Sequence, residues 1–227
     1  MIKAVIFDLD GTLLNTIDDI TDSLNIALSS CGFRRHTAEE TKMHVGSGVK
    51  VLVQRALAGA AFTDRQFSCV EARYLQEYSA RQATKTTAYP GLIHAIDELR
   101  SMGVKTAVLS NKPHQDTLKT VEHFFTPARF DLVLGQREGV PPKPDPAALY
   151  GIIKELGVAK EECLFVGDSD VDMKTAENAG IKKIGVLWGF RDRRVLEASN
   201  ADYIIDKAER IVEIVKGMPA PGQRPAL

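Results

Sequence analysis

Residues 4–12 have the sequence AVIFDLDGT, and this short stretch decides the fold. From Ala4 to Leu9 the residues are mostly apolar and rich in β-formers, which predicts a buried strand. Gly11 breaks the run, as expected at a turn. Two acidic residues, Asp8 and Asp10, stand where the strand ends. The sequence therefore predicts a first strand whose carboxyl end carries acidic side chains.

After this strand the apolar residues adopt helical spacing. They recur at three- and four-residue steps between residues 17 and 31. Capping-box patterns predict three helix starts, at Thr16 with Asp19, Thr37 with Glu40, and Thr63 with Gln66. We expect residues 15–86 to be helical throughout, with no strand.

From about residue 89 onward, predicted strands alternate with predicted helices. We expect strands at residues 104–109, 131–134, 163–166, 183–187 and 203–205. Such alternation is typical of a parallel sheet covered by helices on both faces. The sequence thus predicts an α/β protein in which a helical cap interrupts the core. The expected boundaries are 1–14 and 87–216 for a discontinuous α/β catalytic core, 15–86 for the cap, and 217–227 for a flexible tail.

The composition argues against polyanionic and lipid partners. The chain has 227 residues, 29 basic and 30 acidic, with a formal net charge of -1. Nucleic-acid and membrane surfaces usually need a basic excess, so we expect neither partner. The first apolar run meets an acidic residue at Asp8, unlike a secretion signal. We therefore expect a cytoplasmic protein, while its oligomeric state stays open.

Polar side chains follow four of the expected strands. In an open parallel sheet, ligands bind beyond the carboxyl ends of the strands, so these side chains should share one rim. They are Asp8, Asp10 and Thr12 after the first strand, where Gly11 offers its backbone N–H, Ser110 and Asn111 after the second, Lys143 before the helix that follows the third, and Asp168 and Asp172 after the fourth.

Acidic residues gathered at one rim indicate a bound cation. Close carboxylates repel by roughly 4 kcal/mol per pair at an intermediate dielectric. The available ligand atoms are oxygens, so the sequence predicts a hard cation, Mg²⁺. Lys143 would add one positive charge, and Ser110 could donate a hydrogen bond to a phosphoryl oxygen. Asp8 and Asp10 must differ in role, because one carboxylate attacks and the other transfers a proton.

The motifs Asp8-x-Asp10-Gly11-Thr12, Ser110, Lys143 and Gly167-Asp168-x-x-x-Asp172 resemble the four motifs of the haloacid dehalogenase superfamily. The resemblance implies a Rossmann-like core with a helical cap inserted after the first motif. It implies Asp8 as nucleophile and metal ligand, Asp10 as general acid/base with its backbone carbonyl on the metal, and Asp168 as a direct ligand. Asp172 would hold the metal's water shell or Lys143. Phosphate would be bound by Gly11, Thr12, Ser110 and Asn111.

Within that superfamily the chain looks most like the phosphoglycolate phosphatase branch. The segments that carry this likeness are DGTLL at 10–14, VGSG at 45–48, YPG at 89–91 and KPDP at 143–146. The likeness implies a small phosphorylated metabolite as partner, phosphoglycolate before others. Its second anion would need a partner in the cap, for which the candidates are Gly46, Ser47, Gly48, His44, Lys50 and Arg55. One departure is Asn15, where many relatives carry Asp.

Other activities share the same core motifs. A sugar-phosphate mutase of the β-phosphoglucomutase kind and an inorganic pyrophosphatase differ from a phosphatase in the cap, which the sequence does not resolve. A dehalogenase has no use for Asp10 or a metal. A non-catalytic binding module is the alternative from another class, but it would be expected to lack the nucleophile or a metal ligand, and neither is missing.

Overall fold

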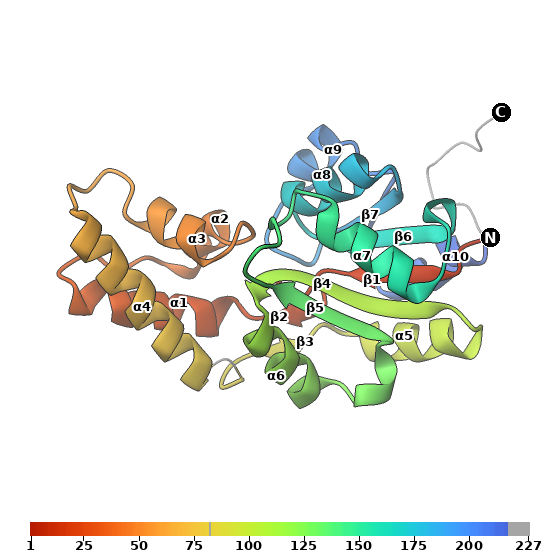
Figure 1. The fold of residues 1–227 in the computed structure, drawn as a ribbon, viewed down its shortest axis with the longest axis horizontal. Coiled ribbons are helices and arrows are strands. Elements are labelled where there is room, and N and C mark those ends of the chain that lie inside the picture. The colour runs from red at the N-terminus through yellow and green to blue at the C-terminus, as the bar shows by residue number, and fades with distance from the viewer. Residues whose placement is uncertain (82, 218–227) are drawn as a thin grey trace.

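The centre of the protein is a six-stranded parallel sheet (Figure 1). It is seen in a computed structural model that describes residues 1–81 and 83–217. The strand order is β5-β4-β1-β6-β7-β8, and each neighbouring pair is parallel. The strands are β1 (Ala4–Phe7), β4 (Lys105–Pro113), β5 (Leu132–Gln136), β6 (Cys163–Gly167), β7 (Lys182–Val186) and β8 (Tyr203–Ile205). The expected α/β, Rossmann-like fold is confirmed.

Strand β1 lies between β4 and β6, where the direction of the strand order reverses. Its four residues are completely buried. Val5 and Phe7 enter one hydrophobic cluster, and Ala4 and Ile6 enter the other on the opposite face. A strand covered on both faces reads as a continuous apolar run, which is why the sequence shows no alternation there.

Helices cover both faces of the sheet. Residues of α5 (Leu92–Ser101), α6 (His114–Phe124) and α10 (Glu209–Val215) contribute to the first cluster. Residues of α7 (Ala147–Leu156) and α8 (Asp170–Ala179) contribute to the second. The shorter helices are η1 (Pro127–Arg129), η2 (Lys160–Glu162) and α9 (Arg193–Ala198). Sequence reasoning did not anticipate α9, which Asp192 caps through the backbone N–H of Val195.

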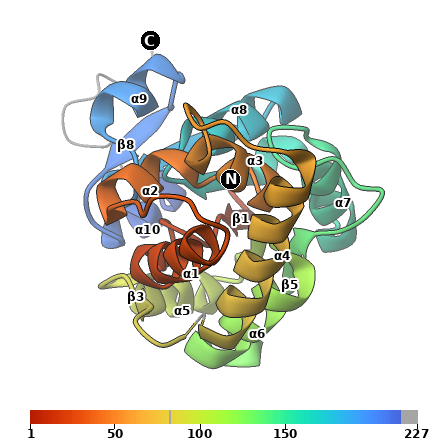
Figure 2. The same cartoon turned by 90° about the vertical axis from the view of Figure 1, so that its left-hand side faces the viewer.

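Four helices form a separate block at one end of the molecule (Figures 1 and 2). They are α1 (Ile17–Ser30), α2 (Ala38–His44), α3 (Val49–Ala56) and α4 (Asp64–Arg81). The block has a hydrophobic cluster of its own, centred on residues such as Leu24, Val53 and Tyr74. This arrangement agrees with the expected division into core and cap, which stays a prediction. Of the expected tail, only Gly217 is among the described residues.

The chain enters and leaves the helical block through a second, two-stranded sheet. Strand β2 (Leu14–Asn15) pairs antiparallel with β3 (Thr87–Ala88). The expectation of no strand from residue 15 onward is therefore wrong at its first residue. Strands of two residues leave no periodicity from which they could be predicted.

Asp19, just after the segment that enters the helical block, binds the segment that returns to the core instead of capping α1. Its carboxylate accepts hydrogen bonds from the backbone N–H groups of Lys85 and Thr86 at 2.9–3.0 Å, and from the Thr86 hydroxyl at 2.7 Å. Thr16 occupies the N-cap position, but its side chain makes no capping bond. The predicted Thr16–Asp19 capping box is therefore wrong, whereas the one at Thr37 and Glu40 is confirmed.

We expect Asp19→Asn to destabilise the protein by about 1–3 kcal/mol, because an amide NH₂ would face buried donors and leave them unpaired. For a chain of this size that lowers Tm by about 2–4 °C per kcal/mol. Thermal unfolding measures the effect, and Asp18→Asn is the control, since Asp18 is the exposed neighbour on the same helix. Equal Tm shifts for the two variants would contradict this role of Asp19.

Candidate active site

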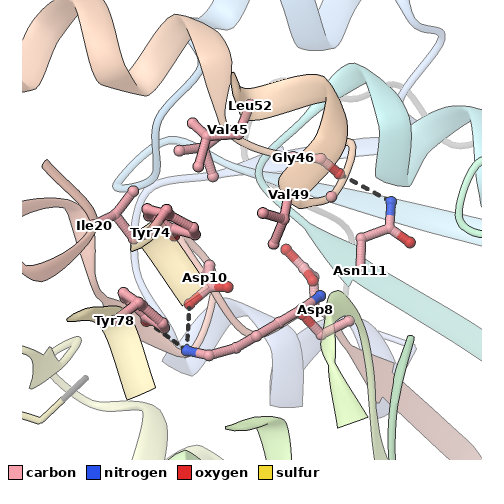
Figure 3. Close-up of a pocket in the computed structure, with 13 residues that line it drawn as sticks. Asp8, Asp10, Ile20, Val45, Gly46, Val49, Leu52, Tyr74, Tyr78 and Asn111 are labelled. Carbon is pink, nitrogen blue, oxygen red and sulfur yellow. Dashed lines mark hydrogen bonds and ion pairs between the residues drawn. The ribbon is translucent and has the colours of Figure 1, made fainter. Parts of the chain in front are cut away.

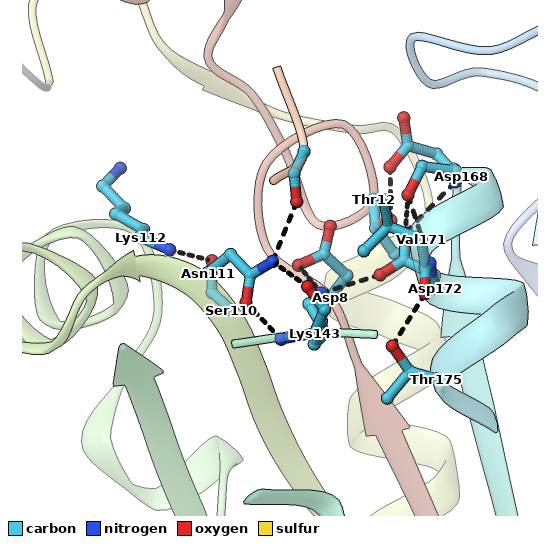
Figure 4. Close-up of polar contacts among 12 residues, drawn as sticks. Asp8, Thr12, Ser110, Asn111, Lys112, Lys143, Asp168, Val171, Asp172 and Thr175 are labelled. Carbon is cyan, nitrogen blue, oxygen red and sulfur yellow. Dashed lines mark hydrogen bonds and ion pairs between the residues drawn. The ribbon is translucent and has the colours of Figure 1, made fainter. Parts of the chain in front are cut away.

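The polar residues anticipated at the strand ends meet at one edge of the sheet. Asp8 follows β1, and Ser110 lies in β4. Lys143 lies in the loop between β5 and α7. Asp168 follows β6, and Asp172 lies in the first turn of α8. Figure 4 shows Asp8, Lys143, Asp168 and Asp172 pointing toward one another from these elements.

Lys143 bridges two of the carboxylates. Its ammonium lies 2.7 Å from Asp8 Oδ1 and 2.7 Å from Asp172 Oδ1, and all three side chains are buried. Burial lowers the pKa of Lys143, but its attraction to Asp172 and Asp8 outweighs this and raises the pKa above its ordinary value. Lys143 is therefore held as a cation at any physiological pH.

The acidic groups outnumber this one cation. Carboxylate oxygens of Asp8, Asp168 and Asp172 lie within 4.8 Å of one another. Burial, then repulsion by Asp172, raises the pKa of Asp8 well above its ordinary value, although Lys143 opposes the shift. Burial and the charge of Asp172 also raise the pKa of Asp168 from 3.8 to about 7. A further cation would relieve this excess charge, and the purely carboxylate donor set fits a hard ion such as Mg²⁺.

Gly11 allows the loop after β1 to fold against Asp168. Its φ of +89° is unfavourable for other residues, and a Cβ atom there would lie 2.4 Å from a carboxylate oxygen of Asp168. The next residue, Thr12, donates its hydroxyl to Asp168 Oδ1 at 3.3 Å. Asp168 also accepts the backbone N–H of Phe190 at 2.7 Å. The loop thus fixes Asp168 beside Asp8, and the predicted phosphate contacts of Gly11 and Thr12 stay predictions.

Next to Asp8, the core and the helical block together line a cavity of about 60 Å³ (Figure 3). The core contributes polar residues to its wall, namely Asp8, Asp10, Ser110, Asn111 and Lys112. The helical block contributes mainly apolar groups, namely Ile20, Val45, Gly46, Gly48, Val49, Leu52, Tyr74 and Tyr78. Asp8 and Asp10 therefore face the same cavity.

The six cap candidates are divided among three places. Gly46 and Gly48 line the cavity. Ser47 and Lys50 line a neighbouring groove. Arg55 donates to the backbone oxygen of His44 at 3.1 Å and to Ser47 Oγ at 3.4 Å, and so braces the loop between α2 and α3. A contact between any of these six residues and a substrate stays a prediction.

Asn111 connects the core to this loop. Its side-chain amide donates to the backbone oxygens of Gly46 at 3.0 Å and of Lys143 at 2.9 Å, and its oxygen accepts the N–H of Lys143 at 2.8 Å. Both of its amide hydrogens are thus engaged with backbone. The contact of Asn111 with phosphate stays a prediction. Because the side-chain amide is engaged, the backbone of Asn111 would have to make that contact.

Sequence reasoning missed several residues around the cavity. Lys112 directly follows two residues that were singled out, and Tyr74 and Tyr78 lie one helical turn apart on α4, so position and spacing could have indicated them. Arg191 was also missed as a contact, and its guanidinium donates to the backbone oxygens of Lys42 and Val45 in the helical block. Such long-range contacts leave no local signal.

Comparisons with known proteins identify relatives of this chain. The family model described as haloacid dehalogenase-like hydrolase matches residues 5–186. A phosphoglycolate phosphatase from Cereibacter sphaeroides is 37% identical over 195 residues, covering 85% of this chain and 88% of the relative. Phosphoglycolate phosphatase 1 of Pseudomonas aeruginosa is 31% identical over 224 residues, covering 94% and 82%.

A solved structure is similar over nearly the whole chain. It is that of a Lactobacillus delbrueckii subsp. bulgaricus protein proposed to be a phosphoglycolate phosphatase, with a TM-score of 0.89 and 36% identity. The match covers 94% of this chain and 98% of that one. Among the described residues, no helix is long and apolar enough to span a membrane.

Proposed function

The chain belongs to the haloacid dehalogenase-like hydrolase family, and from this premise we propose that it is a magnesium-dependent phosphatase that hydrolyses a small phosphate monoester, most of all phosphoglycolate. The observation that carries the proposal is the cluster of Asp8, Asp168 and Asp172 around Lys143, in which Asp8 also lines a small cavity between the core and the helical block. This arrangement combines a buried nucleophile, a fixed positive charge and a place for a metal ion.

Asp8 is the proposed nucleophile. One of its oxygens attacks phosphorus, and the bond from phosphorus to the ester oxygen breaks as the aspartyl-phosphate forms. Asp10, which lines the same cavity, gives its proton to the departing alcohol. It then takes a proton from the water that attacks phosphorus in the second step, which frees inorganic phosphate and restores Asp8.

Lys143 and Ser110 hold the phosphoryl group in this proposal. The Lys143 ammonium, fixed by Asp8 and Asp172, lies where negative charge must be balanced. The Ser110 hydroxyl accepts the backbone N–H of Lys112 at 3.2 Å, which leaves its own proton available for a phosphoryl oxygen.

The carboxylates of Asp8 and Asp168 and the backbone carbonyl of Asp10 would hold Mg²⁺. Asp172, which accepts bonds from Lys143 and Ser169, would act on the ion only through water or through Lys143. The bound ion would neutralise the repulsion between Asp8 and the incoming phosphate and orient both.

The size and lining of the cavity support a small substrate. A water-sized centre needs about 10–15 Å³, so a cavity of about 60 Å³ has room for only a few waters. The apolar side chains of Val45, Val49 and Leu52 roof the reacting groups and would exclude bulk water during the first step. A hexose phosphate would require the helical block to move away from the core.

A screen of small phosphate monoesters with Mg²⁺ tests the assignment. We expect kcat/KM to be highest for phosphoglycolate and at least about tenfold lower for an aryl phosphate and for hexose phosphates, which corresponds to about 1.4 kcal/mol of transition-state binding. A preference for hexose phosphates would move the protein to a sugar-phosphate branch. No turnover of any monoester would support a non-catalytic role.

A further inference from the structure

The wall of the cavity includes a buried lysine that the proposed mechanism does not use. Lys112, in β4, is 7% exposed and is the only basic residue among the described residues that line the cavity. Figure 4 shows its side chain extending away from the group formed by Asp8, Asp168 and Asp172. The protein thus places one ammonium, that of Lys143, against Asp8, and another, that of Lys112, in the wall of the cavity that Asp8 also lines.

Tyr78 of the helical block holds the Lys112 ammonium. The phenol oxygen lies 2.6 Å from Nζ, and the ammonium also lies 4.5 Å from the centre of the Tyr78 ring. Burial and nearby Asp10 raise the pKa of Tyr78 well above its ordinary value, so the phenol is neutral. It positions the lysine without cancelling its charge.

Asp10 is only a loose partner of this ammonium. The distance from Nζ to Asp10 Oδ1 is 3.4 Å, longer than the roughly 2.7–2.9 Å of a strong charge-assisted hydrogen bond. A lysine ammonium has three donors, and among the described residues only Tyr78 and Asp10 accept from it. One donor is therefore left for a ligand. The Asp10 contact is the rival explanation, since Lys112 could simply position Asp10.

We propose that Lys112, positioned by Tyr78, binds the second anionic group of the substrate, a carboxylate, and so selects phosphorylated acids over uncharged phosphate esters. The rest of the cavity wall supports this, because the groups from the helical block are apolar or neutral and leave the cation poorly solvated. A carboxylate there gains a short ionic hydrogen bond in a site that excludes water. The inference rests on the proposed phosphatase function and moves the second anion from the candidate cap residues to β4.

The experiment compares phosphoglycolate with ethyl phosphate, which has the same phosphoryl group and a similar carbon chain but no carboxylate. Lys112→Met keeps the length of the aliphatic part of the side chain and removes the ammonium group. We expect the ratio of kcat/KM for phosphoglycolate to that for ethyl phosphate to fall about 10- to 100-fold, mainly through KM, as expected for one lost ionic hydrogen bond. Tyr78→Phe, which keeps the lysine but releases it, should lower the ratio less. Lys119→Met, on the exposed surface of α6, is the control.

Each outcome decides between explanations. An equal loss on both substrates, mainly in kcat, would show that Lys112 only positions Asp10 and would overturn the proposal. A ratio that falls with Lys50→Met but not with Lys112→Met would place the second anion at the first turn of α3 and would overturn the proposal. A wild-type enzyme that turns over both substrates equally would refute the proposed acid substrate itself, a failure visible before any variant is made. If Lys112→Met unfolds, Tyr78→Phe supplies the same comparison.

Discussion

Asp8→Asn abolishes turnover, with an expected loss on the order of 10⁴-fold or more in kcat, because the rest of a site does not replace a missing nucleophile. The amide has nearly the same shape, so the fold around Lys143 should persist. Steady-state assays with phosphoglycolate and an aryl phosphate should fall alike, since both substrates use the same attacking atom. Asp206→Asn is the matched control, because Asp206 also follows a strand of the sheet but lies exposed at its far edge.

The covalent intermediate gives a second, independent measurement. Quenching during turnover and reducing with borohydride converts an acyl phosphate at Asp8 into homoserine, which peptide mass spectrometry locates. Homoserine at position 8 in the wild type and none in Asp8→Asn is the expected pattern. Reduction at Asp10 instead, or substantial activity in Asp8→Asn, would exclude Asp8 as the nucleophile.

Asp168→Asn should weaken magnesium binding by at least about 100-fold, since even groups that only support metal ligands cost 10–100-fold when replaced. Activity should fall accordingly, and excess chelator should remove the activity of the wild type. Titration calorimetry measures the affinity, and Asp170→Asn is the control, because the Asp170 side chain is 55% exposed next to the site. Full activity in excess chelator would show that the reaction does not require a metal ion.

Although Asp168→Asn should weaken metal binding, it should make the metal-free protein more stable. The pKa of Asp168 is raised to about 7 in the folded state from 3.8, so the folded protein keeps a proton that the unfolded chain releases. Stability therefore falls as pH rises from about 4 to about 7. Asp168→Asn removes this penalty and keeps an oxygen for the N–H of Phe190. In chelator at pH 7.5 the Tm of Asp168→Asn should exceed that of the wild type by a few degrees, since each kcal/mol of stability changes Tm by about 2–4 °C in a chain of this size. The difference in Tm between variant and wild type should be smaller at pH 5. A gap that does not change with pH would contradict this origin.

The sequence predicts those parts of the site that are local. Strand β1 is an uninterrupted apolar run because both of its faces are covered. The polar residues at the carboxyl ends of β1, β4 and β6 converge because parallel strands end at one edge. The meeting of Asp8, Asp168 and Asp172 could thus be anticipated from strand ends alone.

Contacts between distant segments could not be anticipated in this way. Asp19 fits a capping box by spacing, yet 66 residues separate it from Lys85, whose backbone N–H it binds. Tyr78 reads as an ordinary apolar position of α4, and only the closed helical block brings it to Lys112. Local periodicity in the sequence indicates which face of a helix or strand is buried, but it does not indicate which distant residue packs against that face.

The adjacent strands β2 and β3 make the helical block replaceable. Its two ends leave the core side by side, 72 residues apart in sequence from Asn15 to Thr87 and paired in register. Because the inserted segment leaves and re-enters the core at two neighbouring points, its length and structure do not constrain how the strands of the main sheet are connected. Evolution, or a designer, can exchange the segment between these points for a larger, smaller or differently lined one while the clustered carboxylates of the core stay in place. One hydrolytic core can in this way acquire a new range of substrates by a single graft.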